Sequence, residues 1–528
     1  MILLERVGYA VLGICVAYPW INPFSSGPSS TAATWHTAGV MATTIAIVLF
    51  FLLRSKSLLE WPKSMPKVLA WAVFAAAALN AAIGIVQWFG YELMFYPLMA
   101  YSENGIPVGN TRQRNLFGVL NVMGLMSAFY LSAEGSFGIS ADRRPLLRHL
   151  MTLVLVFMGL TAGLALSRTG LLIAVCFAVV VVFRRRTTSS WSLLASYAAG
   201  FALAVVISML PAEWLGLVSQ DLSRRFTDWG GSGRSILYSN MWAIAQQNPW
   251  FGVGWQSLAG AHFSMDYEAL GLSRYPGLVD HAHNLPLHIA VAIGIPAAIA
   301  FTLALAWTIF WLYVHTHRSS ETFYLFALLF AVLSHSFLEY PLWIGGPALL
   351  LVCVLSLLML NLRRKNDGLS LVVSPSFLTG GRMLLFLLAL VLGSMSFWAI
   401  QDYKKLTDWI SASESALKQN LSQPTEPKIN FYLHHVQRQT FLASPPHQGQ
   451  WLNQLTHGME LRQWSAEPQV IERVLALSLS LDMNRWAASE LARYQNSFPA
   501  EAQAWLKRVK KANNDSMANS GVASERKQ

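Results

Sequence analysis

The chain has 528 residues, of which 54% are hydrophobic and only 12% are charged. Soluble globular proteins carry about 25% charged residues, so this composition excludes an ordinary soluble domain and indicates a membrane protein. The net charge of +11 is typical of basic loops that flank membrane spans. We therefore reject nucleic acid as a partner.

Apolar segments long enough to form membrane-crossing helices recur along the chain. A spanning helix needs about 20 largely apolar residues. The pattern predicts an all-α, polytopic membrane protein with about eleven transmembrane helices. In chain order, these segments are 6–22, 37–53, 67–90, 115–133, 148–166, 168–183, 191–211, 285–314, 322–338, 344–361 and 382–400.

Basic residues gather in alternate loops between these segments. The positive-inside rule makes such loops cytoplasmic. The remaining loops, which are poorer in basic residues for their length, then face outward, as does the chain after Ile400. The basic residues that set this orientation are Arg54, Lys56, Lys63, Arg143, Arg144, Arg148, Arg184, Arg185, Arg186, Arg318, Arg363, Arg364 and Lys365.

The distribution of apolar and charged residues divides the chain into five parts. After Ile400, apolar residues recur at helical spacing in a polar background, which predicts a small bundle of helical hairpins with a weak likeness to a tetratricopeptide unit. We expect an N-terminal transmembrane bundle (1–211), a large outward loop with catalytic elements (212–284), a C-terminal transmembrane bundle (285–400), an outward helical domain (401–512) and a disordered polar tail (513–528).

The stretch from Val279 to Pro296 contains the principal candidate for chemistry. His283 precedes a long apolar run, with His281 and Asn284 beside it, and an imidazole at the mouth of a helix can accept a proton near neutral pH. The alternative is an interfacial histidine that hydrogen-bonds to the loop backbone. A zinc site using His281, His283 and His288 is disfavoured because His288 falls on another helix face, so no metal is expected.

Outward arginines form a second group of candidates. A guanidinium group pairs with phosphate oxygens through two parallel hydrogen bonds and stays charged at working pH. Such a cluster fits a diphosphate at the membrane surface, and snorkelling toward lipid headgroups is the alternative. The candidates for diphosphate binding are Arg168, Arg234, Arg114 and Arg224.

The ninth apolar segment ends in a third polar group. His335 and Glu339 have the spacing of neighbours on one helix face, and Tyr340 places a hydroxyl at the water boundary. Tyrosine and tryptophan at span ends are also ordinary membrane anchors. Glu339 is the stronger candidate, because a carboxylate at this depth requires a cationic partner.

Several common catalytic motifs are missing from the sequence. We find no Gly-x-x-x-x-Gly-Lys phosphate loop, no Gly-x-Ser-x-Gly elbow and no outward Asp-x-Asp pair. ATP hydrolysis and serine-esterase chemistry are therefore not expected. The sequence predicts a metal-independent reaction that needs no cofactor.

Taken together, the motifs resemble the O-antigen ligase and Wzy polymerase superfamily, and within it the PglL-type protein O-oligosaccharyltransferases. His283-Asn284, followed nine residues later by Gly294, is similar to the superfamily signature. Gln113-Arg114-Asn115 resembles a Gln-Pro-Asn element of the protein-glycosylating branch, with Arg114 in place of proline. Further similarity lies in Ser167-Arg168-Thr169-Gly170, Asn248 to Gly254 and Glu339 to Trp343.

This resemblance implies transfer of a preassembled glycan from undecaprenyl diphosphate to serine or threonine of a periplasmic protein such as a type IV pilin. It implies a multi-pass protein of the Gram-negative inner membrane, with the active site and C-terminal domain in the periplasm. The expected catalytic positions are His283, Gln113 and Tyr340. The diphosphate would be bound by Arg168, Arg234, Arg114 and Arg224. The site would be supported by Asn284, His281, Glu339 and His335.

Three other functions remain open at this point. The same chemistry would serve an O-antigen ligase acting on lipid A-core or a polymerase that joins glycan repeats. A transporter of the lipid-linked glycan is more distant, because transport predicts ionisable residues at mid-membrane in broken helices, whereas here they collect at the outer ends of the segments.

Overall fold

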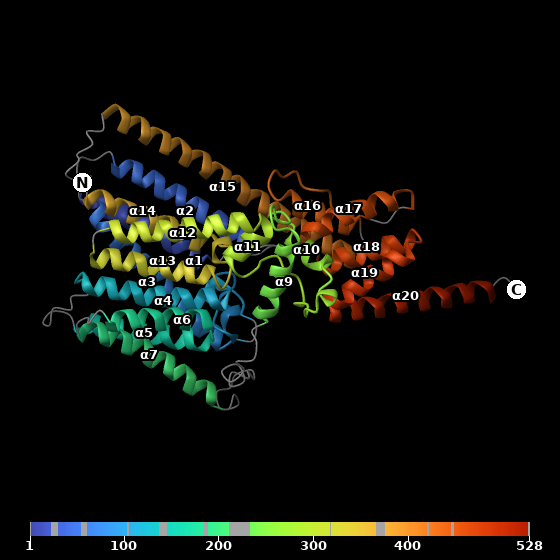
Figure 1. Cartoon of the computed structure of the whole chain (residues 1–528), viewed down its shortest axis with the longest axis horizontal. Coiled ribbons are helices and arrows are strands. Elements are labelled where there is room, and N and C mark those ends of the chain that lie inside the picture. Colours follow the sequence, from blue (N-terminus) through green and yellow to red (C-terminus); the bar gives the residue numbers. More distant parts are fainter. Residues whose placement is uncertain are drawn as a thin grey trace. The chain divides into compact units, whose positions relative to one another are not determined.

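The computed structural model consists of helices and connecting loops, with no strand among the residues that it describes (Figure 1). The residues described are 2–22, 30–53, 61–102, 105–136, 145–183, 188–210, 233–316, 318–365, 375–419, 422–444 and 448–525. The chain forms two compact units. Unit 1 comprises Met1–Gly230 and Ala306–Lys404, and unit 2 comprises Gly231–Leu305 and Lys405–Gln528.

Unit 1 is a bundle of long apolar helices that run side by side (Figure 1). The helices are α1 (Ile2–Ile21), α2 (Ser30–Leu53), α3 (Trp61–Trp88), α4 (Arg114–Ala133), α5 (Pro145–Leu164), α6 (Arg168–Phe183), α7 (Thr188–Met209), α13 (Ser320–Ser336) and α14 (Gly345–Lys365). The second half of α12 (Ile295–His315) and most of α15 (Pro375–Lys418) also belong to this unit.

Helix α4 is the centre of unit 1. Its residues from Leu116 to Leu131 are all buried, and it packs against α3, α6 and α13. A helix that is apolar on every face is stable only when neighbours surround it. This central position fixes the residues at the start of α4, which include the Gln113-Arg114-Asn115 motif.

Among the residues that the structure describes, five helices are long and apolar enough to cross a membrane. They are Ser64–Trp88, Arg114–Ala133, Trp191–Met209, Ile295–His315 and Phe386–Ala416, and five shorter apolar helices accompany them. These helices support a polytopic membrane protein. The expectation of about eleven spans, and their orientation, stays a prediction.

Buried amides of α3 hold the loop that leads into α4. The Asn80 side chain accepts a hydrogen bond from the backbone N–H of Asn110 at 2.8 Å, and the Gln87 carbonyl accepts from the N–H groups of Val108 and Gly109 at 3.0 and 2.8 Å. The Asn110 side chain in turn donates to the carbonyls of Ile21 and Leu98, both at 2.8 Å. These bonds satisfy backbone groups that would otherwise be buried without partners.

Unit 2 is built from shorter helices. They are α9 (Arg234–Gln247), α10 (Leu258–Ser264), α11 (Leu285–Ala292), the first half of α12, the end of α15, α16 (Leu433–Ala443), α17 (Trp451–Trp464), α18 (Pro468–Ser480), α19 (Asn484–Ser497) and α20 (Pro499–Glu525). Successive helices from α17 to α20 pack on one another, which is the arrangement of helical hairpins. Of the tail expected to be disordered, residues 513–525 form the last part of α20, and residues 526–528 lie outside the described residues.

The segment 285–314 was expected to form one helix, and in the structure it is two. Helix α11 ends at Ala292 and α12 begins at Ile295, because Gly294 has a φ of +119° that only glycine adopts readily. The loop after α9 fills the break. Ile295 N–H donates to the Pro249 carbonyl at 2.8 Å, and Val253 N–H donates to the Val291 carbonyl at 2.8 Å.

Two glycines allow this close approach. A Cβ atom on Gly252 would overlap with the carbonyl carbon of Ala292, and one on Gly294 would overlap with the carbonyl of Trp250. The Asn248–Gly254 motif and the Gly294 of the histidine motif are therefore one packed structure. The sequence presented them as separate motifs 40 residues apart.

In unit 2, the loop that contains α10 and the C-terminal tail share a hydrophobic core. Phe263 and Ala259 of α10 are buried together with Ile471, Tyr494 and Trp505 of the tail. The Gly277 N–H also donates to the Ser497 carbonyl at 2.9 Å. The two segments therefore fold as one body.

Candidate functional site

In unit 1, a short hydrogen-bond chain connects three of the motifs identified from sequence. Asn115 Nδ2 donates to Glu339 Oε1 at 2.7 Å, and Ser167 Oγ donates to Asn115 Oδ1 at 3.2 Å. Ser167 Oγ also accepts from the Gly170 N–H at 3.0 Å. Glu339 is 5% exposed and Ser167 is 4% exposed, so a single amide ties together the ends of α4, α6 and α13.

Glycines bring the ends of α4 and α6 together. A Cβ atom on Gly118 would lie 2.5 Å from Ser167 Cβ, and a Cβ atom on Gly170 would lie 2.9 Å from the Gly118 carbonyl carbon. Neither distance is possible for ordinary atoms. The Ser-Arg-Thr-Gly turn therefore requires its glycine, and this close contact sets the position of Arg168.

The remaining candidates of unit 1 surround this hydrogen-bond chain. Gln113 is the N-cap residue of α4, and its side chain makes no capping hydrogen bond. Arg114 and Arg168 are the exposed first residues of α4 and α6. Tyr340 is half-buried beside Glu339, and His335 is buried in the last turn of α13.

We expect Asn115→Leu to lower the free energy of unfolding by about 1–3 kcal/mol, because the buried Glu339 carboxylate loses the hydrogen bond that Asn115 donates. Unfolding of the purified protein in detergent measures this effect. Glu339→Leu serves as the partner variant. The double variant should then be less destabilised than the sum of the two single variants, and simple additivity would contradict the pairing.

In unit 2, His283 is held by its own backbone and by its neighbours. Its φ of +50° is unusual for a residue with a side chain. The Tyr238 hydroxyl of α9 donates to the His283 carbonyl at 3.2 Å. The next residue, Asn284, caps α11 by accepting a hydrogen bond from the Leu287 N–H at 2.9 Å, so that His283 stands immediately before the helix with a half-buried side chain.

Two further histidines, His281 and His288, lie close to His283 in the sequence and form a pair. His281 Nδ1 is 2.8 Å from Asp280 Oδ1, and the rings of His281 and His288 stack with centroids 5.8 Å apart. Burial, with a smaller contribution from His281, lowers the pKa of His288 to about 4, so His288 is neutral at neutral pH. Among the residues described, no three metal-ligating side chains are placed to share one ion.

Arg234 and Tyr238 occupy successive turns of one face of α9, because residues four apart in a helix are neighbours. The Tyr238 hydroxyl donates to the His283 carbonyl. Arg234 is the first residue of the same helix. Arg224, the other arginine expected in this loop, lies outside the described residues.

The structure thus forms two clusters from the expected residues. Unit 1 contains Gln113, Arg114, Arg168, His335, Glu339 and Tyr340, and unit 2 contains Arg234, His281, His283 and Asn284. Sequence reasoning missed Asn115 and Ser167 as connecting residues, although both stand within motifs that it had identified. It also missed Tyr238, for which the sequence offered no signal.

An apolar groove of about 800 Å³ begins at the hydrogen-bond chain of unit 1. At one end it is lined by Ser167, Gly170 and Gly118. From there it follows α6 and α7 to Val182 and Trp191, and small residues such as Ala174 and Ala198 form much of its wall. A groove of this shape suits a long hydrocarbon chain whose polar end lies near Arg168.

Two family models match the chain. Residues 153–302 match a model described as O-antigen ligase, and residues 323–513 match one described as virulence factor membrane-bound polymerase, C-terminal. The first match contains Arg168, Arg234 and His283, and the second contains Glu339 and Tyr340. No curated protein and no solved structure matches the chain.

Proposed function

The chain belongs to the superfamily of membrane-bound O-antigen ligases and Wzy-type polymerases, and from that membership we propose that it transfers a preassembled glycan from undecaprenyl diphosphate to serine or threonine of a periplasmic protein such as a type IV pilin. The observation that carries this proposal is the placement of His283 at the start of α11. A left-handed backbone, the Tyr238 hydroxyl and the Asn284 cap together fix that position.

In the proposed reaction, His283 accepts the proton of the acceptor hydroxyl. The hydroxyl oxygen then bonds to the anomeric carbon of the glycan, while the bond between that carbon and the diphosphate oxygen breaks. The electron pair of the broken bond stays on undecaprenyl diphosphate. His283 finally returns its proton to solvent.

In a reaction of this kind, electrostatic stabilisation of the charge on the departing diphosphate is usually the largest contribution to the rate enhancement. We assign it to Arg168, Arg234, Arg114 and Arg224. Arg168 and Arg114 are exposed at the ends of two helices joined through Asn115 and Ser167, which supports a shared anion site. Gln113 and Tyr340 would position the donor or the acceptor by hydrogen bonds.

The polyprenyl chain of the donor fits the apolar groove along α6 and α7. The groove ends at Ser167 and Gly170, and Arg168 lies between them in the sequence. A lipid lying in this groove would therefore present its diphosphate to the arginine while its tail stays in the bilayer.

A polymerase that joins glycan repeats is the second candidate. It is favoured by the match of residues 323–513 to the C-terminal part of a membrane-bound polymerase. A protein acceptor is supported instead by the helical hairpins of the tail, which share a core with the loop that leads to His283 and could hold a polypeptide near it.

The test is to reconstitute the full-length protein in liposomes with undecaprenyl-diphosphate-linked glycan and, in separate reactions, pilin, lipid A-core or a second lipid-linked glycan. Mass spectrometry of the products identifies the acceptor. We expect glycan on pilin alone. Product on lipid A-core or on the second glycan would replace the protein acceptor by the ligase or the polymerase, and movement of the lipid across the bilayer without any product would exclude transfer altogether.

A further inference from the structure

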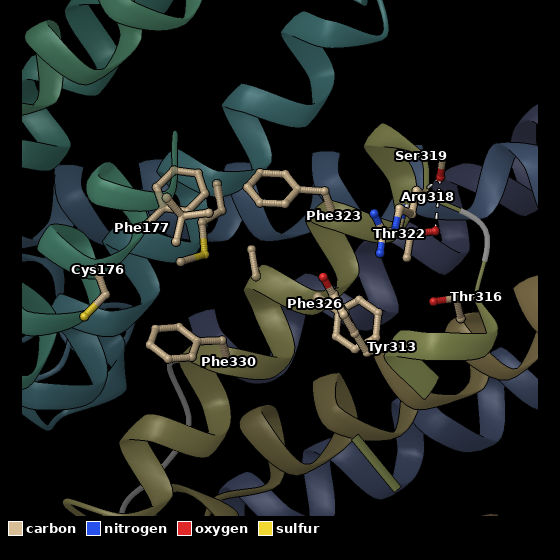
Figure 2. Close-up of a pocket in the computed structure, with 13 residues that line it drawn as sticks. Cys176, Phe177, Tyr313, Thr316, Arg318, Ser319, Thr322, Phe323, Phe326 and Phe330 are labelled. Carbon is tan, nitrogen blue, oxygen red and sulfur yellow. Dashed lines mark hydrogen bonds between the residues drawn. The ribbon is translucent and has the colours of Figure 1, made fainter. Parts of the chain in front are cut away.

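A cavity of about 440 Å³ opens between α4, α6, α12 and α13 of unit 1 (Figure 2). Its volume is in the range of about 300–1,000 Å³ that is usual for ligand sites. Five aromatic side chains line it. Phe177 stacks on Phe323 with centroids 6.2 Å apart, and Phe326 meets Tyr313 edge-on at 5.9 Å. The fifth aromatic residue is Phe330.

One end of the cavity is polar. Arg318 is the one charged side chain among the 13 described residues that line it, and its guanidinium carbon is 5.9 Å from the centre of the Tyr313 ring. Ser319 and Thr322 lie beside it with their hydroxyl oxygens 3.1 Å apart. Because Ser319 is the N-cap of α13, the positive end of the helix dipole adds to the charge of Arg318.

The polar end and the cluster of motifs in unit 1 lie at opposite ends of α13. Arg318 precedes α13 and Glu339 follows it, and the 17 residues of that helix span about 25 Å at 1.5 Å per residue. The hydrocarbon core of a membrane is about 30 Å thick. In the predicted topology, in which this segment crosses the membrane, Arg318 would stand at the membrane–water boundary opposite the motif cluster of unit 1.

The cavity also opens toward the surface of the bundle. Tyr313, Val180 and Phe330 line it, and their exposed fractions are 53%, 43% and 44%. In a membrane, these exposed faces would contact lipid. A hydrocarbon chain could therefore enter from the side without passing through water.

We propose that this cavity binds one anionic phospholipid, which is neither the donor nor the acceptor of glycan transfer. Its phosphate pairs with Arg318 and with the hydroxyls of Ser319 and Thr322, and an acyl chain packs among the phenylalanine rings. An arginine and a helix N-terminus are complementary to a phosphate, and the aromatic wall is complementary to the chain. Glu321, the nearest acid in the sequence, does not line the cavity.

Native mass spectrometry of the full-length protein extracted from membranes that contain both phosphatidylglycerol and phosphatidylethanolamine tests this proposal. The wild-type protein should retain one phospholipid, with phosphatidylglycerol enriched over its share of the bulk lipid. Arg318→Gln should reduce that enrichment by about tenfold, because it removes the charge-assisted bonds to the phosphate. The matched control is Arg6→Gln, which removes the same charge from an exposed position in α1 and should change nothing.

A second variant tests the acyl-chain part of the cavity. Ala327 lines the cavity and is 8% exposed, so Ala327→Trp should fill the space and abolish retention of either lipid. Circular dichroism checks that the variant remains folded. A wild-type protein without retained lipid, or equal enrichment in Arg318→Gln and Arg6→Gln, would overturn the proposal. Neither of these two outcomes would affect the glycan-transfer proposal.

Discussion

Replacement of His283 by alanine is expected to reduce glycan transfer by a factor of about 10²–10⁴, the usual contribution of a positioned general base. The loss should appear in the turnover rate at saturating donor, because His283 is proposed to act on the acceptor proton rather than on donor binding. Transfer from undecaprenyl-diphosphate-linked glycan to pilin in liposomes provides the measurement.

A matched histidine variant separates a specific effect from general damage. His457 of α17 is 45% exposed in its side chain and has no role in the proposed reaction, so His457→Ala should retain wild-type activity. If His283→Ala also transferred glycan at the wild-type rate, another group would have to be the base. If both variants lost activity while folded, the defect would not be specific to His283.

Gly294→Ala is expected to destabilise unit 2 by about 3 kcal/mol or more. The new methyl group would overlap with the Trp250 carbonyl, and the residue would have to adopt a φ of +119°; strain and overpacking each cost about 1–3 kcal/mol. Because α11 carries the Asn284 cap, loss of this junction should also displace His283. The thermal unfolding midpoint and the glycan-transfer rate should therefore fall together.

Gly271→Ala is the matched control. Gly271 also has a positive φ, of +65°, but a Cβ atom there would meet nothing within 4 Å. The Gly271→Ala substitution should lower the free energy of unfolding by about 1–2 kcal/mol from backbone strain alone. It should leave the glycan-transfer rate unchanged. Equal destabilisation by the two substitutions would show that the packing of Gly294 against Trp250 contributes nothing.

Hydropathy located the helices well because each long apolar run must form its own backbone hydrogen bonds. The segment 115–133, for example, coincides with α4, Arg114–Ala133. The same reasoning was wrong for 285–314, where apolar residues continue across the break between α11 and α12. The deciding signal was a single glycine, Gly294, and its importance depends on the backbone of Trp250, which lies far earlier in the chain.

The candidate site was predictable as a set of motifs but not as a set of contacts. The similarity of Gln113-Arg114-Asn115 and of Glu339-Tyr340 to family elements identified both segments. Nothing in the sequence indicated that Asn115 donates to Glu339, because the two residues are 224 positions apart. A hydrogen bond over such a separation follows from the packing of α4 against α13 and not from any local preference.

The shared burial of Phe263 with Tyr494 and Trp505 constrains how the protein can be engineered. A variant truncated after α15 would leave Phe263 and Ala259 of the upstream loop uncovered, so loss of the tail would impair the segment that precedes His283. Exchange of acceptor preference between members of the superfamily would, by the same reasoning, require grafting residues 231–305 and 405–528 as one cassette. A tail grafted alone would have to pack against an α10 whose side chains do not match it, and it would fold poorly.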